Sequence, residues 1–134
     1  MTPQARFRAY VQAFNSGEWG TLLEFYAPDV RLVIGTGTEL IGRDAVIGFY
    51  RKTTQLTHRR IEVLQCLVAE KSLAAEIESE FLAVRDAPDF TARPMTKGDR
   101  YYVNSFVFYD FIGDHYTRIR AATFRREFRP AVAR

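Results

Sequence analysis

The sequence predicts an α+β fold in which three helices pack on one face of a bent antiparallel sheet. Two observations lead to this prediction: apolar residues recur at helical spacing in the first part of the chain, and from His58 onward they alternate with polar residues, which is the period of a strand. The strands predicted there are long, and long strands form a curved sheet. A chain of 134 residues has the length of one ordinary domain, so we expect a single domain over residues 1–134.

The first helix begins after Thr2, a typical N-cap residue before a proline at the first helical position. Its apolar residues have the spacing i, i+3, i+4 and i+7: Phe7, Tyr10, Val11 and Phe14. The same spacing predicts a second helix, which Pro28 ends: Trp19, Leu22, Leu23 and Tyr26. A short strand over residues 30–34 follows. The third helix begins near Gly42 and has one apolar face: Val46, Phe49 and Tyr50.

Four strands are predicted after the helices, paired as two hairpins: residues 58–68 with 73–84, and residues 100–111 with 115–128. Between the hairpins, residues 86–99 form a loop long enough to be a flap over a cavity, with Phe90 and Met95 inside it. Alternation places charged and aromatic residues on the outward face: Glu76, Glu78, Glu80, Arg118, Arg120, Phe124, Arg126 and Phe128. Three carboxylates in a row could serve acid/base chemistry, but glutamates facing arginines across strands are more typical of a solvated sheet face.

The composition excludes several classes of protein. Cys66 is the only cysteine, and with only His58 and His115 the chain cannot build a disulfide framework or a zinc site, so no metal and no cofactor are expected. No apolar run approaches the roughly 18 residues of a membrane span, and the first residues lack the apolar region of a signal peptide, so we expect a cytoplasmic protein without a membrane partner. The net charge is +3, and the arginine-rich end could contact phosphate. Solvated charges are the simpler interpretation, with no nucleic acid as partner.

Three tyrosines lie on the predicted apolar stripes: Tyr10, Tyr26 and Tyr50. A buried phenol must satisfy its hydroxyl group, either on a polar group of the protein or on a ligand. These residues are therefore either core aromatics with incidental hydrogen bonds or part of a ligand pocket. Helices that cap a curved sheet leave a concave space, which such hydroxyls could line.

Three segments resemble the first half of one superfamily: residues 10–17 (YVQAFNSG), 25–30 (FYAPDV) and 41–50 (IGRDAVIGFY). The superfamily contains nuclear transport factor 2, ketosteroid isomerases and SnoaL-type polyketide cyclases, and the pattern of elements is similar over nearly the whole chain. The resemblance implies a cone-shaped, curved antiparallel sheet wrapped around three N-terminal helices. It also implies a deep apolar pocket and a homodimer formed through the outer sheet face.

The resemblance implies catalytic roles for two tyrosines. Tyr10 matches the residue that donates to the dienolate oxygen in ketosteroid isomerases, and Tyr50 matches the tyrosine that supports it. Seven further residues are predicted to line the ligand site: Phe14, Tyr26, Ile34, Phe49, Phe90, Ser105 and Val107. The two carboxyl groups of those isomerases are missing, because the general-base position falls on Ile34 and the oxyanion-hole position falls near Val107. The chain is therefore not a standard ketosteroid isomerase.

Two functions remain open. The first is a small-molecule-binding protein with an apolar pocket, which acts as a lyase, isomerase or cyclase on a hydrophobic cyclic substrate. The second is a non-catalytic dimeric module that binds a ligand or a protein. A group with a perturbed pKa inside the pocket would favour the enzyme, and purely apolar walls would favour the module. The candidates for such a group are Asp29, Ser105, Asp110 and His115.

Two structural expectations accompany these functions. A homodimer is expected because Phe124 and Phe128 make the outward face too apolar for a fully solvated surface. The hydroxyls of Tyr10 and Tyr50 are expected within hydrogen-bond reach of one another or of a common ligand, because both helical stripes face the same concave sheet.

We predict no appreciable isomerisation of a 3-keto-Δ5-steroid. The general base of that reaction contributes on the order of 10² to 10⁴ in rate, and Ile34 at the matching position cannot accept a proton. Ultraviolet absorbance of the conjugated product measures the reaction. The substitution Ile34→Asp should introduce weak activity, whereas ordinary turnover by the unmodified protein would contradict the prediction and point to Asp29 or Asp110 as the base.

Overall fold

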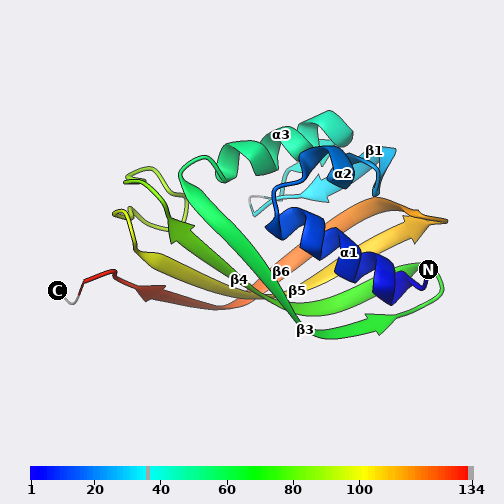
Figure 1. Ribbon diagram of the computed structural model, residues 1–134. Helices are drawn as coiled ribbons and strands as arrows, with labels where there is room; N and C mark the ends of the chain where they lie inside the picture. The colour runs from blue at the N-terminus through cyan, green and yellow to red at the C-terminus, as the bar shows by residue number, and fades with distance from the viewer. Residues whose placement is uncertain (36, 133–134) are drawn as a thin grey trace.

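In the computed structural model, which describes residues 1–35 and 37–132, helices lie over the concave face of one strongly curved sheet (Figure 1). The helices are α1 (Pro3–Asn15), α2 (Trp19–Leu23) and α3 (Arg43–Thr53). The strands are β1 (Tyr26–Val33), β2 (Glu39–Ile41), β3 (Thr57–Val68), β4 (Ser72–Ala83), β5 (Arg100–Ile112) and β6 (His115–Arg129). The predicted α+β class is confirmed. The expected domain of residues 1–134 also contains Thr36, Ala133 and Arg134, which lie outside the described residues.

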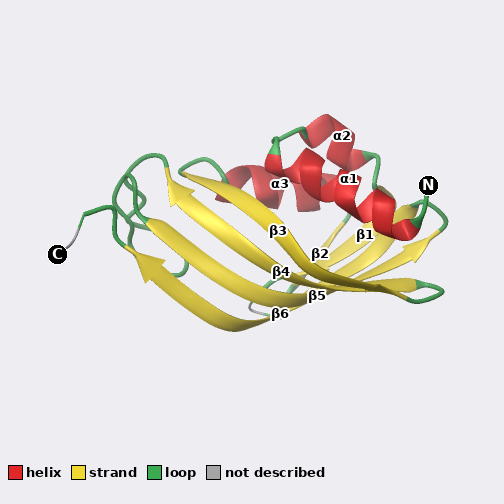
Figure 2. Cartoon of the chain, turned by 60° about the horizontal axis from the view of Figure 1, so that its bottom comes forward, coloured by secondary structure: helices red, strands yellow, loops and turns green. Residues whose placement is uncertain are grey.

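The sheet has the strand order β2-β1-β6-β5-β4-β3 within the described residues, and its four long strands bend together (Figure 2). The pairs from β6 to β3 are antiparallel, as predicted. The sheet as a whole is mixed, because β1 runs parallel to β6. The three-residue strand β2, which pairs antiparallel with β1, was not predicted because it is too short to show a period of two.

The second predicted helix is wrong at its end. The first helix begins as predicted, with the Thr2 hydroxyl accepting a hydrogen bond from the backbone N–H of Ala5 at 3.1 Å. The second helix ends at Leu23, and Tyr26 is the first residue of β1 instead of a helical residue. The backbone N–H of Tyr116 donates to the carbonyl of Phe25 at 2.8 Å. This pairing with a distant strand outweighs the local helical spacing.

A bulge in β6 reverses the direction in which its last residues face. Asn104 lies opposite Arg125 and Ser105 opposite Thr123, so β6 has one extra residue at Phe124. Phe124 faces outward as predicted, stacked on Phe106 at 4.5 Å between ring centroids. The prediction that Arg126 and Phe128 face outward is wrong. Phe128 packs in an inner cluster, and Arg126 lies opposite Val103 on the inner face, because one inserted residue changes the parity of the strand.

The inner face of the sheet holds two hydrophobic clusters. The larger one lies against the helices, with α1 packed along β3 and α3 against β1. The smaller one joins the sheet to residues 86–99: Ala83, Ala87, Met95 and Tyr101, with Phe81, Phe90, Val103 and Phe128 packed against them. Ala87 and Met95 also form an isolated antiparallel bridge. The loop that was predicted to be a flap therefore has its apolar residues packed against the sheet.

The side chain of Asn15 joins the end of α1 to the edge of the sheet. Since β3 is an edge strand of the described sheet, the outward N–H and C=O groups of Ile61 have no neighbouring strand among the described residues. Asn15 Oδ1 accepts a hydrogen bond from Ile61 N at 2.7 Å, and Asn15 Nδ2 donates to Ile61 O at 2.9 Å. The amide replaces the two bonds that a further strand would make, and it holds α1 at a fixed distance from β3.

The substitution Asn15→Ala should lower the free energy of unfolding by about 2 kcal/mol, because it leaves two part-buried backbone groups without partners. Urea denaturation followed by circular dichroism measures the change. Gln12→Ala removes a polar side chain from the exposed face of the same helix and should change stability by less than about 0.5 kcal/mol. Equal stability of the two variants would contradict the role assigned to Asn15.

Candidate functional site

A cluster of buried tyrosines fills the centre of the concave face around Tyr10. Its ring meets the rings of three other tyrosines edge-on, with centroid distances of 5.8 Å to Tyr26, 5.4 Å to Tyr109 and 5.3 Å to Tyr116. The hydroxyl oxygens of Tyr10 and Tyr26 are 2.8 Å apart, and both side chains are 0% exposed. The hydroxyls of Tyr10 and Tyr26 therefore satisfy one another within the protein.

Burial determines the protonation state of these tyrosines. It raises the pKa of Tyr10 and Tyr26 well above the usual value of 10.0, and neighbouring tyrosines add to the effect. Burial also raises the pKa of Tyr109 and Tyr50. For Tyr50, the positive charge of Arg59 opposes this rise in pKa. The phenols are neutral near physiological pH and act as hydrogen-bond donors.

The nine predicted site residues fall in three places. Seven of them belong to the larger cluster or pack against it: Tyr10, Phe14, Tyr26, Ile34, Phe49, Tyr50 and Val107. Phe90 packs against the smaller cluster, and the hydroxyl of Ser105 lies 3.2 Å from that of Thr123. Tyr10 and Tyr50 share the larger cluster, and neither is exposed by more than 6%. The direct partner of the Tyr10 hydroxyl is Tyr26.

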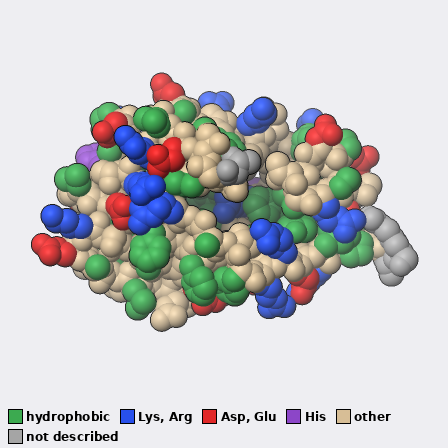
Figure 3. Space-filling view, turned by 180° about the vertical axis from the view of Figure 1, so that it is seen from behind, with side chains coloured by type: hydrophobic (Ala, Val, Ile, Leu, Met, Phe, Trp, Pro, Cys, Tyr) green, Lys and Arg blue, Asp and Glu red, His purple; other side chains and the backbone are tan. Residues whose placement is uncertain are grey.

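A cleft of about 330 Å³ opens where the end of α1 faces the start of β3. Its lining comes from α1 and the turn after it, from α2 and from the ends of α3, β3 and β4: Phe14, Asn15, Ser16, Gly17, Trp19, Thr54, His58, Arg59 and Val84. This volume lies at the lower end of the range of small-molecule pockets. Seen from behind, the molecule is hollowed at its centre, and hydrophobic side chains and a Lys or Arg side chain lie inside the hollow (Figure 3).

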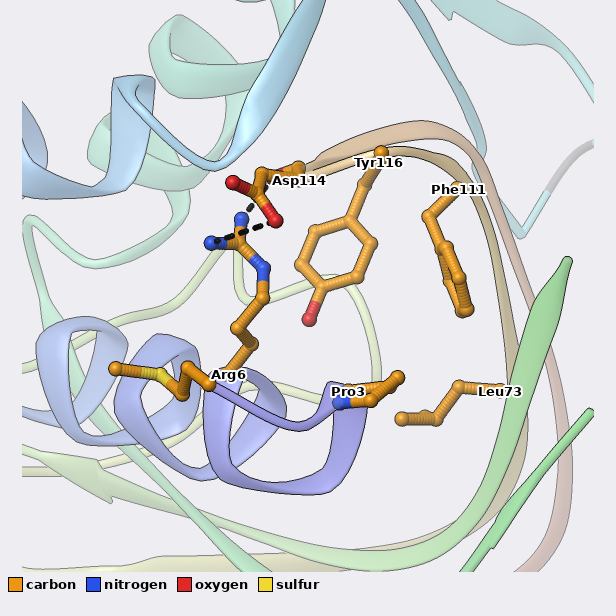
Figure 4. Close-up of a pocket in the computed structure, with 8 residues that line it drawn as sticks. Pro3, Arg6, Leu73, Phe111, Asp114 and Tyr116 are labelled. Atoms are coloured by element: carbon orange, nitrogen blue, oxygen red, sulfur yellow. Dashed lines mark hydrogen bonds and ion pairs between the residues drawn. The ribbon is translucent and has the colours of Figure 1, made fainter. Parts of the chain in front are cut away.

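A smaller cavity of about 60 Å³ lies at the start of α1 (Figure 4). Arg6 and Asp114 form an ion pair of 3.8 Å on one side of it, and Leu73 and Phe111 line another. The hydroxyl of Tyr116 has no hydrogen-bond partner among the described residues and points between these groups. The space suits a few water molecules and is too small for a ring-sized ligand.

Arg59 brings a charged group into the larger cleft. Its Nε and Nη2 atoms donate to Ser79 Oγ at 3.2 and 2.9 Å. Its guanidinium carbon lies 5.3 Å from the ring centroid of Phe14 and 5.2 Å from that of Phe81.

The sequence-based site did not contain Arg59. The alternation of residues along β3 could have indicated it, because this arginine lies on the same face of the strand as Ile61 and Val63.

The four candidate acid/base groups do not line either cavity. Asp29 and His115 are exposed. Asp110 accepts a hydrogen bond from Arg120 at 2.7 Å on the outer face of the sheet. Ser105 faces inward and is engaged with Thr123. None of these groups is therefore in place to move a proton on a ligand in the cleft.

Two further properties concern only the part of the chain that the structure describes. It contains no group of three His, Cys, Asp or Glu side chains placed to hold a metal ion. None of its helices has the length and hydropathy needed to cross a membrane.

A model of the SnoaL-like domain matches residues 7–119, so the chain belongs to the SnoaL-like family. The resemblance carried by residues 10–17, 25–30 and 41–50 is thereby confirmed. No curated protein matches the sequence.

Solved structures share the fold at low sequence identity. A SnoaL-like polyketide cyclase from Agrobacterium tumefaciens has a TM-score of 0.75 and 20% identity over 93% of both chains. An LEH-like epoxide hydrolase from M. tuberculosis has a TM-score of 0.72 and 8% identity, covering 90% of this chain and 80% of its own. A computationally designed 17-OHP binder has a TM-score of 0.73 and 12% identity, covering 92% and 95%. One fold thus serves enzymes and a binder, and the function has to be argued from the site.

Alkaline pH should unfold the protein in one cooperative step. Tyr10, Tyr26 and Tyr109 have a raised pKa in the folded state, so their contribution to stability is complete below pH 10 and is lost as the pH rises above it. Each should lower the free energy of unfolding by about 1.4 kcal/mol per pH unit in that range. Circular dichroism and tyrosinate absorbance should change together. Ionisation of all tyrosines with the circular dichroism unchanged would contradict the prediction.

Proposed function

We propose that this SnoaL-like protein binds a hydrophobic cyclic small molecule in the cleft between the end of α1 and β3. The aromatic walls of that cleft carry the proposal. Phe14 and Trp19 meet edge-on at 6.0 Å and 83°, a rigid arrangement that offers ring faces and edges to a cyclic ligand. The Asn15 amide is already bonded to Ile61, so the wall beside these rings is fixed before a ligand enters.

This geometry best supports ligand binding without a reaction that needs a carboxylate as general base. The candidate groups Asp29, Asp110 and His115 lie outside the cleft lining, and the Tyr10 hydroxyl is engaged with Tyr26. A lyase, isomerase or cyclase is the second candidate, and Tyr50 is the residue that supports it. Its ring touches Phe14 in the cleft wall at 4.9 Å, and its neutral phenol lies within the field of Arg59. Tyr50 itself is outside the cleft lining, so Arg59 is the group of this pair that would meet a ligand oxygen that gains negative charge.

Ligand binding can be followed directly, because Trp19 is the only tryptophan of the chain and lines the cleft. A compact neutral ring compound, 1-adamantanecarboxamide, should change the Trp19 fluorescence on binding and produce heat in calorimetry. The substitution Val84→Phe places a ring in the cleft and should weaken this binding at least about tenfold.

Val68→Phe is the matched control, because Val68 and Val84 are both 40% exposed and Val68 is not in the cleft lining. This control should bind as the unmodified protein does. Equal loss of affinity in both variants, or no loss in Val84→Phe, would place the ligand elsewhere.

We also infer that two copies of the chain associate through the outer face of the sheet. Four large apolar side chains on this face are about half exposed or more: Leu67, Phe106, Phe108 and Phe124. A contiguous apolar patch of this kind is unusual on a monomer. Strand β5 has negative charges on one side and positive charges on the other. The negative side is β4, with Glu76 and Glu78, and the positive side is β6, with Arg120 and Arg125. A two-fold axis parallel to the strands would therefore bring opposite charges together around the apolar centre.

The substitution Phe106→Glu should convert the dimer to a monomer, because it places a charge in the centre of the buried patch. Light scattering of the unmodified protein should give twice the chain mass of 15.5 kDa, and the variant should give the chain mass. Ile112→Glu changes a side chain that is exposed at the β5–β6 turn and should leave the dimer intact. A monomer mass for the unmodified protein at micromolar concentration would contradict the inference.

A further inference from the structure

The ligand cleft contains a fixed positive charge that no carboxylate of the described residues neutralises. The described ion pairs do not involve Arg59, and no Asp or Glu is among the residues that line the cleft. A guanidinium stays protonated at any physiological pH.

The hydrogen bonds of Arg59 leave one edge of its guanidinium open. Both bonds go to Ser79 Oγ, from Nε and from Nη2, which together form the side edge of the group. The end edge, formed by Nη1 and the second hydrogen of Nη2, has no partner among the described residues. Two parallel N–H groups at this edge match the two oxygens of a carboxylate.

The surroundings make an anion the favoured partner for that edge. The guanidinium carbon lies over the rings of Phe14 and Phe81, so it faces apolar walls where bulk water would otherwise solvate it. A partly desolvated cation is stabilised most by a hydrogen-bonded anion. Ser79 is 1% exposed, and its two bonds to Arg59 hold the guanidinium in one orientation before a ligand binds.

The geometry points to a cyclic carboxylate as the ligand class, with the ring against Phe14 and Trp19 and the carboxylate on the end edge of Arg59. This inference rests on the proposed function, because it assigns the ligand of the same cleft. A single fixed cation matches the one negative charge of a carboxylate. A phosphate dianion would carry more charge than the lining compensates.

Two probes that share one ring system test the inference: 1-adamantanecarboxylate and the neutral 1-adamantanecarboxamide. Both are measured by Trp19 fluorescence and by calorimetry with the full chain. The unmodified protein should bind the carboxylate at least about tenfold more tightly than the amide, which is the effect of a charge-assisted hydrogen bond. Binding of the carboxylate should weaken as the pH falls through the pKa of the probe itself.

The variant Arg59→Gln should lose the preference for the carboxylate and keep its affinity for the amide within about threefold. Arg60→Gln is the matched control, because Arg60 carries the same charge one residue away and is exposed on the opposite face of β3. The control should keep the full preference. Arg59→Lys retains the charge without the planar edge and should keep only part of it.

The outcomes separate this inference from the proposed function. Equal affinity of the unmodified protein for both probes would contradict the carboxylate as the ligand class, but it would still agree with the proposed binding of a cyclic compound. A preference that survives in Arg59→Gln would overturn the role of Arg59. If neither probe binds, the proposed function and the inference fail together. If Arg59→Gln does not fold, the probe ratio and the pH dependence of the unmodified protein still decide the ligand class.

Discussion

The hydrogen bond between the hydroxyls of Tyr10 and Tyr26 is the contact on which the arrangement of helices and sheet depends. Tyr10 comes from α1, and Tyr26 begins β1 directly opposite Tyr116 of β6. Arg43 of α3 donates from Nε to the carbonyl of Tyr26 at 2.8 Å, so the same residue also anchors the third helix. A buried polar pair without water to replace it allows little variation in position. One tyrosine therefore ties two helices to two strands.

Tyrosine rings fill the centre of the concave face, and the larger cleft lies at the other end of α1. The rings around Tyr10 leave no ring-sized space at the start of α1, where the cavity measures only about 60 Å³. At the other end of α1, the chain turns through Ser16 and Gly17, and Gly17 has a φ of +67°, which glycine adopts without strain. Small residues at this turn leave room beside Trp19 and Arg59. The cleft therefore lies where α1 ends and the chain turns through small residues.

The residues of the cleft differ from those that the resemblance to ketosteroid isomerases implies. The positions that would carry two carboxyl groups are occupied by apolar side chains, whereas the cleft contains a cation held by a serine and flanked by phenyl rings. A carboxylate base removes protons, but a guanidinium in an apolar wall binds and orients an anion. Under the proposed function, this cation would lead the scaffold to retain anionic ring compounds.

Local patterns in the sequence predict much of the fold, because helix caps and periods of 3.6 or 2 depend on neighbouring residues. The first and third helices, the four long strands and the pairing of their hairpins were predicted in this way. The tertiary structure decided the rest. Tyr26 became a strand residue through pairing with Tyr116, and Phe128 turned inward because of a bulge opposite Asn104 and Ser105. Arg59 entered the candidate site only when β4 brought Ser79 beside it and the end of α1 closed over it, contacts between residues far apart in the chain that no local pattern contains.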